Sequence, residues 1–511
     1  MLPALSGTWC RAAVPMLLLA LAGAVRAAPP DEMPPALRAA LERARIEPGA
    51  LSAWVAPAKG GEPRLALRPA EAVAPASVMK LVTTVAALER LGPVFQWHTP
   101  MLAAGPDRIL RGGGDPRLTG ERLTLLLHQA MDAGGATIDG DLILDRGAYA
   151  LPPHDPAAFD GQPLRPYNVG PDALMIANRS VVLTLRPEPV RGVARVAVDL
   201  PLAGVQWPET VPLAGGDCQD WRAQLAPDFS DPSRPRLAGR FPAACGERSW
   251  PIAFPDPAPA GFAARAVEAQ WRALGGRLGG RVREGRAPAG ATVLSDWSSP
   301  ALPEVLRDMN KHSNNMIAQQ VLLALSPGQP AQPATFEAAR AEVQSLVRTH
   351  GCREDELVID NGSGLSRQER VTPRCLGRLL QWAWSRPWMP ELLSSLPVAG
   401  IETTARRAVA ASGRAHLKTG SLDDVAALAG YVHGEDGRRH VLVAILNHPK
   451  AGGAESRAVL DEVVRWALDD LARPPAVGAD DQNGLLRARF SAALPTRDCQ
   501  FGPGTCAPAH R

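Results

Sequence analysis

The chain has 511 residues, too many for one ordinary hydrophobic core, so the length predicts two to four domains. Hydrophobic residues make up 46% and charged residues 21%, proportions that are typical of a globular protein and exclude a largely disordered one. The net charge of +3 and the absence of long like-charge runs give no indication of a nucleic-acid partner.

The N-terminus has the pattern of an export signal. Arg11 precedes the apolar run AAVPMLLLALAGAV, and small residues follow at Val25-Arg26-Ala27. The run is too short to span a bilayer, and no later stretch reaches the roughly 18 apolar residues that a spanning helix requires. We therefore predict a signal peptide at residues 1–27, and an exported mature protein with no integral membrane segment after cleavage.

Secondary-structure patterns divide the rest of the chain into three kinds of segment. Residues 51–69 show the alternation of side-chain polarity that is typical of a β-hairpin, with a Gly-Gly turn, and an amphipathic helix follows at 75–92. Short β-like runs separated by Pro and Gly then continue to about residue 290. Long helical patterns return after residue 299, followed by two strand-like segments and the helical segment ESRAVLDEVVRWALDDLA.

This pattern predicts one domain built from two distant halves of the chain, residues 28–97 and 291–472. We expect the intervening residues 98–290 to form a mostly β insertion made of two nested smaller domains. The tail at 473–511 has little periodicity and is left unassigned.

Cysteine usage agrees with an oxidising compartment. Cys10 would leave with the signal peptide, and six cysteines remain. Six cysteines allow fifteen connectivities. Proximity in sequence suggests three pairs, and no pair has the spacing of a zinc site with partner histidines, so we expect neither a metal nor another cofactor. The suggested pairs are Cys218 with Cys245, Cys352 with Cys375, and Cys499 with Cys506.

The helix at 75–92 carries the first chemical signal. Ser77 and Lys80 are three residues apart, so a helix places both side chains on one face. A lysine with a lowered pKa can remove the proton that makes serine a poor nucleophile. The chain has only five lysines, yet one of them would have a serine three positions earlier by chance about one time in five. The pair could therefore also be a helix cap followed by a solvated lysine, and alone it does not indicate catalysis.

Two further triplets change this interpretation. Ser313-Asn314-Asn315 and Lys418-Thr419-Gly420 follow Ser77 and Lys80 in chain order. A chance Lys-Thr-Gly triplet is expected only a few times in about a hundred such chains. Together the three motifs, Ser-x-x-Lys, Ser-x-Asn and Lys-Thr-Gly, indicate a serine acyl-transferase.

The motifs resemble those of penicillin-recognising serine enzymes, and other segments narrow the resemblance to the class C low-molecular-mass penicillin-binding proteins, the D-alanyl-D-alanine carboxypeptidase/endopeptidase branch. The resemblance covers about residues 35–470. It implies an α+β fold of the β-lactamase/DD-peptidase type, an antiparallel sheet flanked by helices and interrupted by the insertion. The segments that carry it are LRGGGDPRLTGERLTLL, YNVGPDALMIANRSVVLTL, DMNKHSNNMIAQQ and IDNGSGLSRQERVTP.

The resemblance also implies roles for the motif residues. Ser77 would attack the peptide carbonyl with Lys80 as general base, and Ser313 would pass a proton toward the leaving amine. Asn315 would hold the substrate amide. The remaining residues form the strand side of the site: Lys418 and Thr419 for the terminal carboxylate, Gly420 for close approach of the substrate, and Ser421, whose backbone N–H would complete an oxyanion hole with that of Ser77.

Recognition of the substrate side chain is assigned by the same resemblance to Arg367 and Asp145, with Tyr149 as an aromatic wall. Opposite charges would suit the zwitterionic end of a diamino acid such as meso-diaminopimelate. Asp145 could equally be a turn residue at the end of a strand. Asp423 departs from the neutral residue expected after the Lys-Thr-Gly motif and leaves fine specificity open.

The resulting hypothesis is a periplasmic, penicillin-sensitive serine peptidase whose partners are peptidoglycan peptides, with β-lactams as inhibitors, no nucleic acid, and a homodimer as one candidate assembly. Two alternatives stay open. A β-lactamase shares the three motifs, although no Glu-x-x-Leu-Asn deacylation signature stands between Asn315 and Lys418. A non-catalytic peptidoglycan-binding scaffold would keep the fold without turnover.

Overall fold

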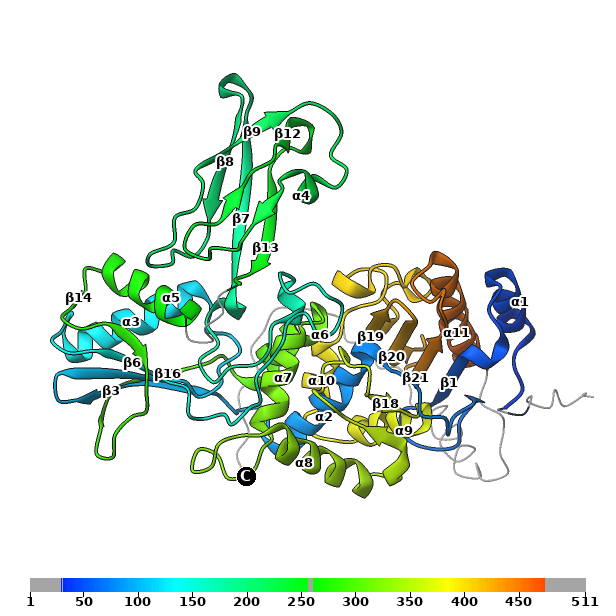
Figure 1. Ribbon diagram of the computed structural model, residues 1–511. Coiled ribbons are helices and arrows are strands. Elements are labelled where there is room, and N and C mark those ends of the chain that lie inside the picture. Colours follow the sequence, from blue (N-terminus) through cyan, green and yellow to red (C-terminus); the bar gives the residue numbers. More distant parts are fainter. Residues whose placement is uncertain (1–28, 30, 256–260, 474–511) are drawn as a thin grey trace, which may run out of the picture.

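The computed structural model describes residue 29 and residues 31–255 and 261–473 (Figure 1). The predicted signal peptide, the third predicted cysteine pair and the tail after residue 473 lie outside these ranges. Within them the chain forms three five-stranded sheets with helices packed around them, so the predicted α+β class is confirmed. No helix in these ranges is both long and apolar enough to cross a membrane.

The central sheet joins the two ends of the described chain. Its strands are antiparallel throughout, and Trp54 of the first strand pairs with Val443 of the last. The predicted hairpin and the two predicted C-terminal strands therefore lie in one sheet. In spatial order the strands are β19 (Ala415–Leu422), β20 (Val425–His433), β21 (Arg439–Asn447), β1 (Leu51–Pro57) and β2 (Leu65–Leu67).

Both faces of the central sheet are buried, and successive residues of β20 alternate between them. Ala427 and Tyr431 pack into an apolar cluster with helices of one face, whereas Leu428 and Val432 pack into a second cluster on the other. Figure 1 shows the two helical layers on either side of the sheet. The first layer contains α2 (Lys80–Arg90), α6 (Leu302–Lys311), α7 (Asn315–Ala324), α8 (Phe336–Thr349), α9 (Pro373–Trp384) and α10 (Met389–Ser395), and the second contains α1 (Pro35–Ala44) and α11 (Ala454–Ala472).

The other two large sheets come from the middle of the chain. One lies beside the helical layer and the other projects away from it as an upright arm (Figure 1). The first contains β15 (Val282–Glu284), β6 (Leu142–Asp145), β4 (Asp107–Arg111), β3 (His98–Ala104) and β16 (Thr292–Ser298), covered by α3 (Gly120–Gly134) and α5 (Gly261–Ala273). The arm contains β12 (Phe241–Pro242), β9 (Thr210–Ala214), β8 (Val193–Val198), β7 (Ser180–Glu188) and β13 (Arg248–Ala253), with α4 (Trp221–Gln224).

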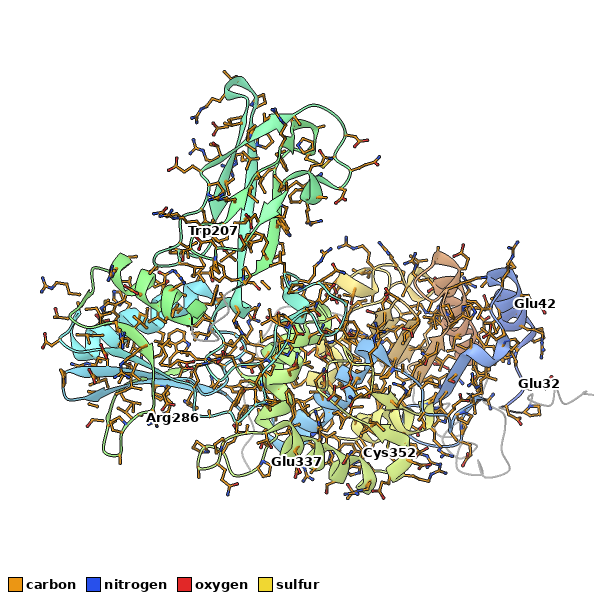
Figure 2. The ribbon with its side chains drawn as sticks, viewed as in Figure 1. Glu32, Glu42, Trp207, Arg286, Glu337 and Cys352 are labelled. Carbon is orange, nitrogen blue, oxygen red and sulfur yellow. A yellow bond between two sulfur atoms is a disulfide. The ribbon has the colours of Figure 1, made fainter. Side chains whose placement is uncertain are left out.

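Aromatic side chains join the arm to the sheet below it. Trp207, labelled at the base of the arm in Figure 2, meets Phe254 edge-on, and Phe254 in turn packs against Phe262 of α5. A single apolar cluster runs through both sheets. The domain division stays a prediction, but β16 extends the first insertion sheet to Ser298, past the expected boundary at residue 290.

Two of the predicted disulfides are confirmed. Cys218–Cys245 closes a loop in the arm, and Cys352–Cys375 ties the segment after α8 to the first turn of α9. The three remaining pairs of strands are short ladders: β5 (Thr137–Ile138) with β14 (Arg277–Leu278), β10 (Pro227–Asp228) with β11 (Arg236–Leu237), and β17 (Leu357–Val358) with β18 (Arg370–Val371).

Candidate active site

Ser77 lies in a single 3₁₀ turn, Ala76–Met79, immediately before α2. Ala76 has a φ of 45°, which lies in the left-handed region of backbone conformation. A residue with a Cβ atom is strained in this region. The turn presents Ser77 at the start of the helix, and Lys80 follows as its first residue. Lys80 Nζ donates a hydrogen bond of 2.9 Å to Ser77 Oγ, so the predicted pair is in direct contact.

Lys80 is fully buried, and its remaining polar contacts come from distant parts of the chain. Nζ donates to Asn315 Oδ1 at 2.7 Å and to the backbone carbonyl of Ser363. Burial holds the pKa of Lys80 well below its ordinary value, and the charge of Lys418 lowers it further, while Glu369 acts in the opposite direction. The site therefore favours a neutral amine at the position where a general base is needed.

The second motif is shaped by a helix cap. Asn314 Oδ1 accepts a hydrogen bond from Ile317 N, which fixes the start of α7 and leaves Ser313 with a φ of 55° just outside it. In this position Ser313 Oγ accepts a hydrogen bond of 2.9 Å from Lys418 Nζ. Asn315, the first residue of the helix, faces Lys80 instead. The Ser-x-Asn motif thus contacts both lysines.

Lys418 lies on β19, the edge strand of the central sheet, and is also fully buried. Burial lowers its pKa to about 7. The next inward position on the strand is Gly420, where an added Cβ would lie 2.8 Å from Pro75 O and 3.1 Å from Ser77 N. A larger residue would push the strand away from the serine. Glycine thus allows the backbone of β19 and that of Ser77 to lie close together, as a two-donor oxyanion hole requires.

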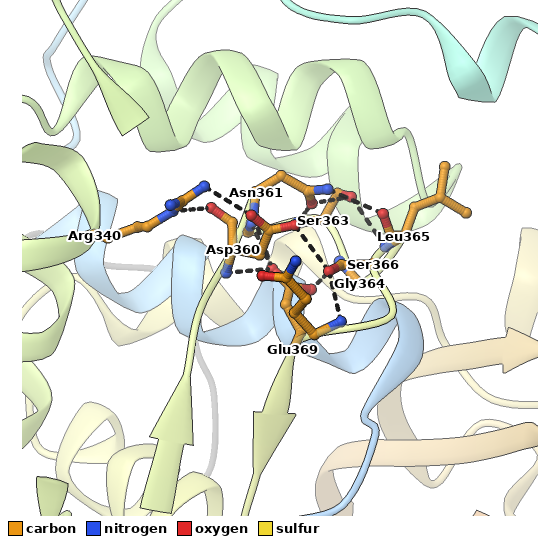
Figure 3. Close-up of polar contacts among 10 residues, drawn as sticks. Arg340, Asp360, Asn361, Ser363, Gly364, Leu365, Ser366 and Glu369 are labelled. Atoms are coloured by element: carbon orange, nitrogen blue, oxygen red, sulfur yellow. Dashed lines mark hydrogen bonds and ion pairs between the residues drawn. The ribbon is translucent and has the colours of Figure 1, made fainter. Parts of the chain in front are cut away.

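A buried glutamate, Glu369, holds the loop that carries the Ser363 carbonyl (Figure 3). Its Oε1 accepts backbone N–H groups of Asp360, Asn361 and Gly362 at 3.2, 3.1 and 2.7 Å, and its Oε2 accepts that of Gly364 at 2.8 Å. Burial raises the pKa of Glu369 to about 7, although these hydrogen bonds lower it.

The same loop packs against the 3₁₀ turn that carries Ser77. Gly364 has a φ of 86°, and an added Cβ would lie 2.0 Å from Ala76 O. Figure 3 shows the loop folded around the Glu369 carboxylate, with Asp360 also bonded to Arg340 and Ser366. No motif or periodicity in the local sequence distinguishes Glu369 from a surface glutamate, so its role emerges only from the structure.

The motif residues open onto a cavity of about 600 Å³. Ser77, Ser313, Thr419, Gly420 and Ser421 line it, whereas Lys80, Asn315 and Lys418 lie buried behind them. The structure therefore brings together all eight residues predicted from the three motifs. Within the described ranges, no group of three or more His, Cys, Asp or Glu residues is arranged to hold a metal ion.

The three residues assigned to substrate side-chain recognition do not lie together in one site. Asp145 is buried at the end of β6, where it accepts hydrogen bonds from Gly147 N at 2.9 Å and Ala287 N at 3.0 Å. These contacts are those of the alternative interpretation, an acid that ends a strand. Tyr149 is buried in an apolar cluster with Ala173, Leu323 and Ala334. None of the three residues lines the cavity.

Arg367 has different neighbours from those expected. Its guanidinium carbon lies 4.4 Å from the centre of the Phe159 ring, and Nη1 lies 3.7 Å from Asp424 Oδ1. The side chain is 56% exposed. Phe159 therefore takes the place that the sequence analysis gave to Tyr149. No periodicity or motif marks Phe159, which lies in a segment with no regular secondary structure.

A family model described as D-Ala-D-Ala carboxypeptidase 3 (S13) matches residues 35–469. The D-alanyl-D-alanine carboxypeptidase DacB of Haemophilus influenzae is 27% identical over 411 residues, which cover 76% of this chain and 84% of that protein. The D-alanyl-D-alanine carboxypeptidase of an Actinomadura species is 28% identical over 432 residues, 75% of each chain.

Among solved structures, penicillin binding protein 4 (dacB) of Haemophilus influenzae matches with a TM-score of 0.69 and 25% identity, covering 86% of this chain and 99% of that one. A complex of that protein with a β-lactam matches with a TM-score of 0.64. The expected DD-peptidase fold, an antiparallel sheet flanked by helices, is confirmed by this likeness.

Glu369 generates a stability prediction. Its pKa is about 7 in the folded state against 4.5 for an ordinary glutamate, so the folded protein holds this proton more tightly. The stability that this proton contributes is fully present below pH 4.5 and is lost as pH rises through 7, by up to about 3 kcal/mol. In Glu369→Gln that part of the pH dependence should disappear, as measured by urea unfolding between pH 4 and 8.

The matched control is Glu62→Gln, which removes an exposed glutamate and should leave the pH profile of the wild type unchanged. Because glutamine also loses one acceptor for the loop N–H groups, the slope against pH is compared and not the absolute stability. An identical slope of unfolding free energy against pH in Glu369→Gln and the wild type would contradict a raised pKa at Glu369.

Proposed function

The chain belongs to the D-Ala-D-Ala carboxypeptidase 3 (S13) family, and from that premise we propose that Ser77 is the nucleophile of a serine-type D-Ala-D-Ala carboxypeptidase and endopeptidase acting on peptidoglycan peptides. The observation that carries the proposal is the contact between Ser77 Oγ and a fully buried lysine amine at 2.9 Å. A buried, deprotonated amine accepts the serine proton, which an arginine at the same position could not do.

Acylation begins when Ser77 Oγ attacks the carbonyl carbon of the penultimate D-alanine and its proton passes to Lys80 Nζ. The backbone N–H groups of Ser77 and Ser421 stabilise the resulting oxyanion. The bond from the carbonyl carbon to nitrogen then breaks, and the proton that Lys80 took passes to the leaving nitrogen through Ser313, which the hydrogen bond from Lys418 orients. Lys80 is then neutral again. The acyl group remains as an ester on Ser77.

Deacylation repeats these steps with water as the nucleophile. Water attacks the ester carbonyl and one of its protons passes to Lys80 Nζ. The bond from the carbonyl carbon to Ser77 Oγ then breaks, and Lys80 returns the proton to Ser77 as the acid leaves. Asn315 holds the substrate amide from one side, and β19 offers its edge from the other, in the manner of strand addition. Lys418 and Thr419 bind the terminal carboxylate of a carboxypeptidase substrate.

Arg367 and Phe159 form the proposed contact surface for the substrate's diamino-acid side chain. The exposed guanidinium stacks on the ring, and the nearby Asp424 gives the surface both signs of charge. A zwitterionic side-chain end suits such a surface. Asp145 and Tyr149, which the resemblance implied for this role, make their contacts elsewhere.

We also propose that the enzyme acts outside the cytoplasm, in the periplasm. Two disulfides support an oxidising compartment, in agreement with the predicted signal peptide. The β-lactam complex of the Haemophilus influenzae protein supports inhibition by β-lactams. The homodimer stays a prediction.

The nucleophile is tested by a labelled penicillin followed over time. We expect stable labelling of one serine per molecule in the wild type and in Ser394→Ala, a change at an exposed serine, and none in Ser77→Ala. Mass analysis of purified muropeptides then reports whether monomers lose D-alanine and whether dimers split. Rapid release of hydrolysed drug would favour a β-lactamase, and no labelling at all would favour a non-catalytic scaffold.

The side-chain surface is tested by Arg367→Ala. Because penicillin lacks the diamino-acid side chain, we expect kcat/KM for diaminopimelate-containing peptides to fall about fivefold while the rate of penicillin acylation changes much less. Arg348→Ala, at an exposed arginine of α8, is the matched control. Equal losses with both compounds would remove Arg367 from the side-chain surface.

A further inference from the structure

The active-site cavity extends beyond the catalytic residues into a region rich in arginine. Beside Ser77 and Ser313, its lining includes a short segment after α10, Thr403 to Ala408, and one side of α11. The charged residues of this extension are Arg406, Arg407, Arg457 and Asp461. Three cations against one carboxylate make it a positively charged pocket directly connected to the nucleophile.

The segment that carries Arg406 and Arg407 is held against the catalytic strand. Ala399 N donates to Ala415 O at 2.9 Å, and Leu417 N donates to Pro397 O at 3.0 Å, so residues 397–399 lie along the start of β19. Glu402 forms an ion pair with Lys311, two residues before Ser313. These contacts fix the arginine segment to both catalytic motifs, which places it beside the Ser313 and Lys418 pair.

Within the described part of the chain, the two arginines of the segment have no partner of their own. The side chains of Arg406 and Arg407 are exposed and make no hydrogen bond or ion pair with any residue that the structure describes. Arg457 differs, because it lies one turn from Asp461 on α11. Burial raises the pKa of that carboxyl, and the charges of Arg465 and Arg457 act in the opposite direction. Two unpaired cations in a cavity connected to the active site are positioned to bind an anion.

The location of the arginines indicates which part of a substrate they meet. Ser313 delivers the proton to the leaving amine in the proposed mechanism, so groups beyond the broken bond extend past Ser313. When the leaving group is D-alanine, its one carboxylate is bound by Lys418 and Thr419. When it is the side-chain amine of a crosslinked diamino acid, the leaving peptide carries additional carboxylates, for which the motif residues provide no further cation.

We infer that Arg406 and Arg407 form a subsite for the carboxylates of the leaving peptide strand and direct the enzyme toward crosslinked substrates. The inference rests on the proposed function of the Ser77 site and deepens it, because it assigns a substrate class to a part of the cavity that the three motifs do not reach. Exposed ion pairs of this kind contribute modestly to binding and are screened by salt.

The test compares a crosslinked muropeptide dimer with the monomeric pentapeptide, using the full-length protein. In the double variant Arg406→Gln/Arg407→Gln, the ratio of kcat/KM for dimer to that for monomer should fall about tenfold, mainly through KM. A dimer amidated at the carboxylates of its leaving strand should lower the same ratio in the wild type. The double variant Arg406→Lys/Arg407→Lys should retain most of the dimer preference, and Arg348→Gln should behave as the wild type.

Raising the salt concentration should reduce the wild-type ratio toward that of the glutamine variant. A ratio that does not change in the glutamine variant overturns the inference, as does a wild type that cleaves monomers only. Failure of the proposed function gives a different result: the wild type then cleaves neither muropeptide, or hydrolyses penicillin rapidly. A thermal melt of each variant checks that these surface substitutions leave the fold intact.

Discussion

The burial of Lys80 is the constraint on which the rest of the structure depends. Moving an isolated ammonium out of water costs several kcal/mol, so a lysine with no exposed surface gains stability by losing its proton. The apolar cluster between α2, α7 and the central sheet excludes water from this amine. Among the residues that the structure describes, three oxygens accept hydrogen bonds from it, those of Ser77, Asn315 and Ser363.

Those oxygens come from three distant segments, and each segment is positioned by its own local feature. The strained turn at Ala76 presents Ser77, the Asn314 cap starts the helix that carries Asn315, and the Glu369 carboxylate gathers the loop that carries Ser363. Glu369 has a second effect, because its charge raises the pKa of Lys80 while Lys418 lowers it. The basicity of the amine thus reflects its burial first, and then the opposed charges of Lys418 and Glu369.

Much of the site could be predicted from the sequence because its catalytic residues belong to short sequence motifs. Ser77 and Lys80 follow from helical spacing, the two triplets complete the set, and the family, fold class and two described disulfides were predicted correctly. Asp145 and Tyr149 were placed by resemblance alone, and the structure gives them neighbours other than those that the resemblance implied. Glu369 bonds to backbone N–H groups only five to nine residues away, but no motif marks it, and Phe159 meets Arg367 from a distant part of the chain.

The scarcity of lysine makes the central claim directly measurable. With only five lysines in the chain, a protein labelled with ¹³C at lysine Cε gives a simple NMR spectrum in which each amine can be titrated separately. We predict two signals with a pKa well below 10.5, one near 7 from Lys418, and another that disappears in Lys80→Arg. A Lys80 signal that titrates at the ordinary value would contradict the account, because the amine would then be charged when the serine must lose its proton.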